Sequence, residues 1–198
     1  MNHPKGHVLI TVFLALFSFL SVGYMACKKD NAITSNDPCA QMTCKNGGVC
    51  FKGSCTCIAG FDGKNCEIPW ITPYPGTWDV TEKIVGSVAS GNKGKERKYI
   101  LTLQAHSKPH MLFMQNLAGN GSFKDVEAII GGKSGRTPTE FIINAKVFPN
   151  DPYNTRLARG FGSINSIGTM VSGQYVLAYI FDNLPIVDTI NFEGTYKQ

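Results

Sequence analysis

Cysteine is distributed very unevenly along this chain of 198 residues, and its distribution constrains the fold more than any other feature. The chain has seven cysteines. One of them, Cys27, lies apart from the other six, which are close together in one short segment. So short a segment cannot bury enough apolar surface to fold around a hydrophobic core, so disulfides would have to stabilise it. The clustered residues are Cys39, Cys44, Cys50, Cys55, Cys57 and Cys66. The isolated Cys27 is expected to have a different chemical role.

The N-terminus contains an uncharged, apolar run from Val8 to Val22, preceded by Lys5. It is too short to cross a bilayer, for which a helix needs about 20 apolar residues, and it is typical of a secretory signal peptide. The run is followed by Ala26-Cys27 and then by a polar stretch. This order resembles a bacterial lipoprotein signal, which implies removal of residues 1–26 and acylation of Cys27. The alternatives are a secreted chain with a free or intermolecularly paired thiol, and an uncleaved anchor.

The polar tether of residues 27–38 begins Cys27-Lys28-Lys29-Asp30. This start resembles the envelope lipoproteins of Bacteroidota, whose sorting signal follows the acylated cysteine. The resemblance implies an outer-membrane-anchored protein of the bacterial cell envelope, either periplasmic or surface-exposed. Acyl chains would hold it firmly, because each buried CH₂ contributes about 0.8 kcal/mol.

An extracytoplasmic location makes disulfides the expected state of the clustered cysteines, although sequence alone does not choose among their possible pairings. The segment Cys55-Thr56-Cys57, the closing Cys66 and the preceding Asn46-Gly47-Gly48 resemble an EGF-like domain over residues 39–66. The resemblance implies a rigid spacer module. It also implies the pairs Cys39–Cys50, Cys44–Cys55 and Cys57–Cys66.

Metal binding is not expected in this module. Zinc sites use pairs of the form Cys-x₂-Cys or histidine ligands, and the cluster contains neither. A calcium site of EGF type needs acidic and amide ligands, but no Glu precedes Cys39 and Lys52 would repel a cation. We therefore predict no metal and no cofactor.

Residues 67–75 contain three prolines and form a semi-rigid linker, after which no further cysteine occurs. The remaining segment, residues 76–198, is long enough for one independent core. Apolar and polar residues alternate along most of it, as in Leu101-Thr102-Leu103, which indicates half-buried antiparallel strands. Clusters of Gly, Pro, Asn and Asp separate eight candidate strands. They lie near 77–85, 98–105, 110–117, 122–130, 139–148, 158–165, 169–182 and 187–196.

Eight successive strands leave two exposed edges unless the sheet closes, which favours a meander closed into a barrel. Gly76-Thr77-Trp78 resembles the opening of lipocalins, and this resemblance implies that Trp78 plugs one end of the barrel, with Gly194-Thr195-Tyr196 beside it. The predicted fold is thus mainly β: a disulfide-rich EGF-like module plus an eight-stranded antiparallel lipocalin-like β-barrel. A β-sandwich is the alternative.

No catalytic constellation is found, and we predict that the protein is not an enzyme. His106 and His110 are separated by Pro109, so they are expected in a hairpin turn and not on one helix face. Gly131-Gly132-Lys133-Ser134 imitates a phosphate-binding loop, but Glu127 occupies the position of the required first glycine. This segment is therefore expected to be a turn.

The chain has a formal net charge of +5, and Lys93, Lys95, Arg97 and Lys98 are expected to share one loop. Such a loop is either merely solvated or meets acidic glycans or lipid head groups. Nucleic acid is not expected as a partner, because no aromatic residues are interleaved with these charges.

A barrel of eight strands can be filled by side chains or can hold one small ligand. One hypothesis is a tethered lipoprotein that binds a small apolar ligand or a surface partner. The other is a structural or adhesive surface protein with a filled barrel that contacts protein or glycan. Small inward residues would favour the first and continuous large ones the second, and no ligand-binding residue is assigned. The bulky inward candidates are Phe113, Phe141, Tyr175, Tyr179 and Phe192.

Overall fold

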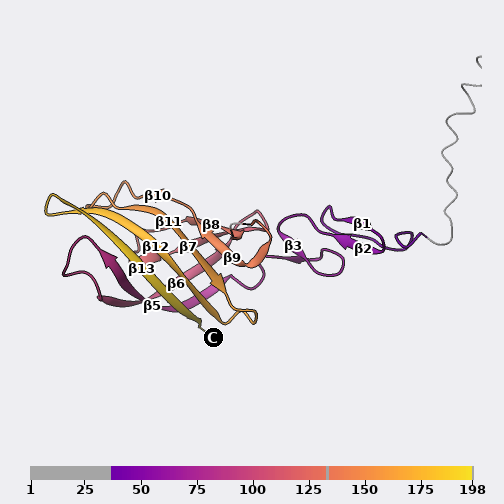
Figure 1. The fold of residues 1–198 in the computed structure, drawn as a ribbon, viewed down its shortest axis with the longest axis horizontal. Coiled ribbons are helices and arrows are strands. Elements are labelled where there is room, and N and C mark those ends of the chain that lie inside the picture. The colour runs from indigo at the N-terminus through magenta and orange to yellow at the C-terminus, as the bar shows by residue number, and fades with distance from the viewer. Residues whose placement is uncertain (1–36, 133, 198) are drawn as a thin grey trace, which may run out of the picture. The chain divides into compact units, whose positions relative to one another are not determined.

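A computed structural model describes residues 37–132 and 134–197 of the protein (Figure 1). These residues form thirteen β-strands and one short 3-10 helix, which confirms the mainly β fold class. The predicted signal peptide and Cys27 lie outside the described residues. Within the described part of the chain, no helix has the length and apolar character needed to cross a bilayer.

The cysteine-rich region contains two small antiparallel hairpins. Strand β1 (Val49–Phe51) pairs with β2 (Ser54–Thr56), and β3 (Phe61–Asp62) pairs with β4 (Ile68–Pro69). Cys44 is bonded to Cys55 and Cys57 to Cys66, with Cα–Cα distances of 5.6 and 5.3 Å. Both pairs agree with the EGF resemblance, and Cys39 and Cys50 are also disulfide-bonded.

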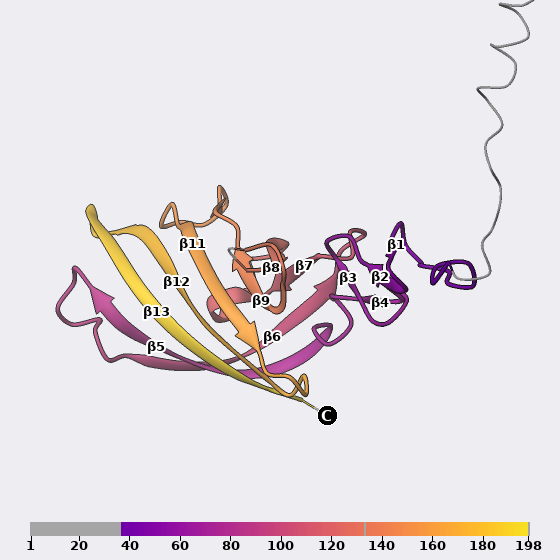
Figure 2. The ribbon, with the colours of Figure 1, turned by 45° about the vertical axis from the view of Figure 1, so that its right-hand side comes forward.

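The remaining strands form one continuous antiparallel sheet that closes into a barrel. Strands β5 to β9 pair in chain order, as do β10 to β13, and the two runs are joined by the pairs β13–β5 and β9–β11. Figure 2 shows the long strands β5, β6, β12 and β13 curving along one side, with the shorter β7, β8 and β9 opposite. The strands are β5 (Gly76–Ser87), β6 (Glu96–Ala105), β7 (Met111–Gln115), β8 (Val126–Gly131), β9 (Thr137–Ile143), β10 (Lys146–Val147), β11 (Arg156–Ile164), β12 (Met170–Phe181) and β13 (Leu184–Tyr196).

The predicted eight-stranded closed barrel is confirmed, and the β-sandwich alternative is wrong. The expected meander order is also correct, because the eight barrel strands, β5 to β9 and β11 to β13, follow one another around the sheet. One predicted strand, at 139–148, is divided into β9 and the short β10, because the chain stops pairing with β8 after Ile143. The two-residue β10 instead pairs with the start of β11.

One end of the barrel, here called the base, is sealed by aromatic residues. Trp78 is completely buried there, and its indole N–H donates a hydrogen bond of 3.2 Å to the Tyr74 carbonyl oxygen. Tyr196 is the register partner of Trp78 and packs edge-on against it, with ring centroids 5.2 Å apart. The Tyr74 hydroxyl donates to the Pro138 carbonyl oxygen at 2.8 Å. The expected plug by Trp78 beside Tyr196 is therefore present.

The middle of the barrel is filled by aromatic rings that lie over glycines. Phe141 and Phe192 are each 1% exposed. A Cβ atom added at Gly173 would lie 2.7 Å from the Phe192 ring, and one at Gly162 would collide with the Phe141 ring. The glycines thus make room for the rings, as in designed sheets where aromatic residues cover strand glycines.

Phe113 does not point inward, contrary to prediction. Its register partner on β6 is the exposed Gln104, and its ring lies 4.8 Å from that of His106. The inward residues of β7 are instead the fully buried Leu112 and Met114. Neighbouring Met, Leu and Phe residues conceal the alternation in this strand, so the pattern did not reveal which face is buried.

The opposite end of the barrel is here called the mouth. In an antiparallel meander alternate connections lie at the same end, so the mouth is formed by four of them. These are the β5–β6 loop, the β7–β8 connection with η1 (Leu117–Gly119), the β9–β11 connection and the β12–β13 turn. The expectation that Arg97 and Lys98 belong to a loop is wrong, because both lie in β6.

Candidate functional site

A cavity of about 320 Å³ opens at the mouth of the barrel. Apolar side chains from three different segments line part of it, namely Ile84 on β5, Leu177 on β12 and Phe123 between β7 and β8. Phe123 is held in place by Phe148, whose ring is stacked on it at a centroid distance of 3.9 Å. Polar side chains, including Asn92, Arg97 and Asp188, complete the lining. The cavity is therefore amphipathic.

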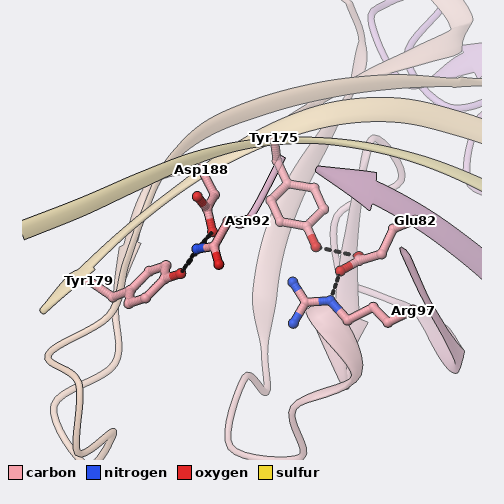
Figure 3. Close-up of polar contacts among 6 residues, drawn as sticks. All are labelled: Glu82, Asn92, Arg97, Tyr175, Tyr179 and Asp188. Atoms are coloured by element: carbon pink, nitrogen blue, oxygen red, sulfur yellow. Dashed lines mark hydrogen bonds and ion pairs between the residues drawn. The ribbon is translucent and has the colours of Figure 1, made fainter. Parts of the chain in front are cut away.

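A buried carboxylate lies at the inner side of the cavity. Glu82 on β5 is 2% exposed, and its Oε2 atom accepts a hydrogen bond of 2.5 Å from the Tyr175 hydroxyl (Figure 3). Its Oε1 atom accepts from Nε of Arg97, with which it forms an ion pair. Burial lowers the pKa of Arg97 and is the largest single effect, but the Glu82 charge, Tyr175, the hydrogen bond to Glu82 and Tyr99 together outweigh it, so the pKa is raised overall. Arg97 therefore stays charged and compensates the carboxylate.

Tyr99, two residues after Arg97 on β6, has a buried hydroxyl oxygen. Burial raises its pKa, and the Glu82 charge raises it further. Burial likewise raises the pKa of Tyr175, with the neighbouring Tyr99 and Glu82 as further causes. Both phenols are therefore protonated at neutral pH.

A second polar group lies nearer the mouth. The Tyr179 hydroxyl donates to Oδ2 of Asp188 at 2.8 Å, and the Asn92 amide nitrogen lies 3.4 Å from the same oxygen (Figure 3). The Asn92 amide also donates to the Tyr179 hydroxyl at 2.9 Å, and the Lys95 ammonium donates to Oδ1 of Asn92 at 2.9 Å. Burial raises the pKa of Tyr179 to about 12, and its bond to Asp188 contributes. This group links the β5–β6 loop to β12 and β13.

Arg97 stands between the two polar groups. Its Nε atom contacts Glu82, whereas the terminal nitrogens of its guanidinium point toward the side of Asn92 and Tyr179 in Figure 3. Arg97, Asn92, Tyr179 and Asp188 all line the cavity. The arrangement offers a small ligand hydrogen-bond donors and acceptors above an apolar wall.

The raised tyrosine pKa values predict a distinctive alkaline titration. Four of the six tyrosines that the structure describes, Tyr74, Tyr99, Tyr175 and Tyr179, have raised pKa values. The unfolded chain would release these protons near pH 10, so stability should be full below pH 10 and fall as the pH rises toward 12. Absorbance of tyrosinate should therefore appear together with loss of circular dichroism. Complete ionisation of the tyrosines near pH 10 with the fold intact would contradict this expectation. Tyr179→Phe should reduce by one the number of tyrosines that ionise above pH 10.

The residues singled out in the sequence for possible chemistry do not meet in this cavity. His106 and His110 lie in or beside the β6–β7 loop at the base, which agrees with the predicted hairpin turn. The described residues of 131–134 lie at the β8–β9 turn, also at the base. Within the residues that the structure describes, no group of three or more His, Cys, Asp or Glu side chains could hold a metal ion.

The polar residues of the cavity were missed in the sequence, although a signal for them exists. Along β5 the inward positions are Trp78, Val80, Glu82 and Ile84, so the alternation itself places a carboxylate inside. Asp188 likewise falls between the inward residues of β13. A charged residue in phase with a buried apolar row is the pattern to look for. No protein-family model matches the chain.

Proposed function

We propose that this protein is a non-enzymatic lipoprotein of the bacterial cell envelope whose β-barrel holds a small ligand at its mouth. The cavity of about 320 Å³ carries this proposal, because it combines an apolar wall with polar side chains in the interior of the barrel. Its volume corresponds to about ten water molecules at about 30 Å³ each, near the small end of ligand pockets. The ligand is thus small and partly apolar.

The location rests on the sequence. Cys27 follows an apolar run of signal-peptide length and is the proposed acylation site. Disulfides in the cysteine-rich region suit an oxidising compartment outside the cytoplasm. We interpret this region as an EGF-like spacer between the anchor and the barrel.

Cys27→Ser should move the protein from the membrane fraction to the soluble fraction, because the thiol that would carry the acyl chains is lost. The measurement is fractionation of host cells followed by alkaline extraction of the membranes. A variant that stays membrane-bound after this extraction would show that the anchor is not at Cys27.

A filled, adhesive barrel is the second candidate function. It is favoured by the aromatic filling of the base and middle, and by large exposed apolar residues such as Phe161, Phe181 and Leu184. In this case the loops and outer wall, and not the cavity, would contact protein or glycan.

Native mass spectrometry of the full chain purified from its host distinguishes the two functions. Leu177 lines the cavity and is 5% exposed, so Leu177→Trp should fill the cavity. Asn191→Trp introduces the same side chain at an exposed position of β13 and serves as the control. An extra mass lost on denaturation is expected in the wild type and in the control but not in Leu177→Trp. A bare polypeptide mass in all three would favour the adhesive function.

A further inference from the structure

The carboxylate of Asp188 has one oxygen that the protein leaves without a partner. Asp188 is 2% exposed, and its Oδ2 atom already accepts from Tyr179 and Asn92. Its Oδ1 atom is buried and accepts no hydrogen bond from residues 37–132 or 134–197. A buried polar atom without a partner costs free energy, and more so when the group is charged.

The strand geometry fixes this carboxylate in place. Asp188 lies on β13 directly opposite Leu177 of β12, and both side chains line the cavity. The bond from Tyr179 and the contact with the Asn92 amide hold Oδ2 from two directions. Oδ1 is therefore a fixed acceptor without a hydrogen-bond donor from the described residues, on a side chain that lines the cavity beside Leu177.

The other charged side chains of the cavity each have at least one partner. Nε of Arg97 is paired with Glu82, the Lys95 ammonium donates to the Asn92 side chain, and Oδ2 of Asp151 accepts from the Thr155 hydroxyl. Among the cavity residues that the structure describes, Oδ1 of Asp188 is the buried side-chain oxygen or nitrogen without a hydrogen-bond partner.

We propose that the ligand of the mouth cavity carries a hydrogen-bond donor, a hydroxyl or a protonated amine, that binds Oδ1 of Asp188 while its apolar part lies against Leu177, Ile84 and Phe123. This inference rests on the proposed ligand-binding function and specifies its ligand class. The donor would complete the coordination of the carboxylate, and the apolar part would cover the wall. A hydrogen bond to a charged acceptor should raise the affinity about tenfold over that of a ligand without the donor.

Four probes that each carry an eight-carbon chain test the inference on the full chain with Cys27→Ser, which leaves every described residue unchanged. Octan-1-ol and octylamine carry a donor, octyl methyl ether lacks one, and octanoate offers only acceptors at neutral pH. Dissociation constants from calorimetric titration should be about tenfold lower for the alcohol or the amine than for the ether. If octylamine binds more tightly than octan-1-ol, the donor of the ligand is a protonated amine. If the two bind with similar affinity, the donor is a hydroxyl. Equal binding of the ether, or preference for octanoate, would overturn the inference without any substitution at Asp188.

Asp188→Asn keeps the shape of the side chain but allows an N–H₂ group to replace the free acceptor. It should abolish the preference for donor-bearing probes while leaving the affinity for the ether similar. Asp182→Asn removes the same charge from the exposed β12–β13 turn and should change nothing. An unchanged preference in Asp188→Asn would refute the role of Asp188.

The two levels of the proposal fail differently. If no probe binds, or if Leu177→Trp leaves every affinity unchanged, the cavity does not bind ligand and both proposals fall. If all four probes bind equally and Leu177→Trp weakens them all, the ligand-binding function stands and the donor requirement is wrong.

Discussion

Replacing Arg97 by methionine is expected to lower the free energy of unfolding by about 3 kcal/mol at pH 7. The substitution removes the cation that neutralises Glu82, whose side chain is 1% exposed, and leaves a buried charge with the Tyr175 hydroxyl as its remaining hydrogen-bond donor. Breaking one partner of a buried ion pair costs about 3–5 kcal/mol, and the lower end applies because the Arg97 side chain is 45% exposed. Urea denaturation followed by circular dichroism measures the loss.

Two further variants isolate the electrostatic effect. Lys83→Met breaks the exposed pair between Lys83 and Glu96, which is 2.8 Å long, and should cost less than about 1 kcal/mol. Glu82→Gln should restore much of the stability when combined with Arg97→Met, because the buried charge is then absent. Equal losses for Arg97→Met and Lys83→Met would show that burial of Glu82 does not matter.

Replacing Trp78 by alanine is expected to cost about 4 kcal/mol of unfolding free energy. Trp78 is completely buried at the base, donates to the Tyr74 carbonyl oxygen and packs against Tyr196. Removing a large aromatic side chain from a core costs about 3–5 kcal/mol, because the surrounding residues close the resulting cavity only in part. The same denaturation experiment measures this effect.

Trp78→Phe provides the matched comparison. It keeps an aromatic ring at the base but removes the indole N–H, so it should cost about 1–2 kcal/mol. The difference between the two variants measures the filling of the base separately from the hydrogen bond. If alanine and phenylalanine cost the same, the ring does not contribute to sealing the barrel.

The architecture was predictable because it depends on a simple periodicity. Apolar and polar residues alternate in eight segments, which indicated the strands. The need to cover two exposed sheet edges indicated that the sheet closes into a barrel. The structure differs where the pattern is ambiguous, as at Phe113, whose immediate neighbours on β7 are both apolar. Sequence alone does not fix the register that places Phe113 opposite Gln104.

The cavity was harder to predict for a different reason. Charged side chains are mostly exposed, so Glu82 and Asp188 were not singled out in the sequence. Their burial depends on partners far away in sequence: Glu82 meets Tyr175, and Asp188 meets Asn92. Such pairs become visible only when the register of β5, β12 and β13 is known.

The pairing of β5 with β13 also determines the order in which the chain can fold. Trp78 and Tyr196 are register partners although they come from opposite ends of the barrel sequence, so closure requires a contact of very large sequence separation. During synthesis β5 can pair with β6 early, but its other edge stays open until β13 arrives. An open edge pairs readily with strands of other chains. The interval before β13 emerges is therefore the period in which aggregation competes most strongly with folding.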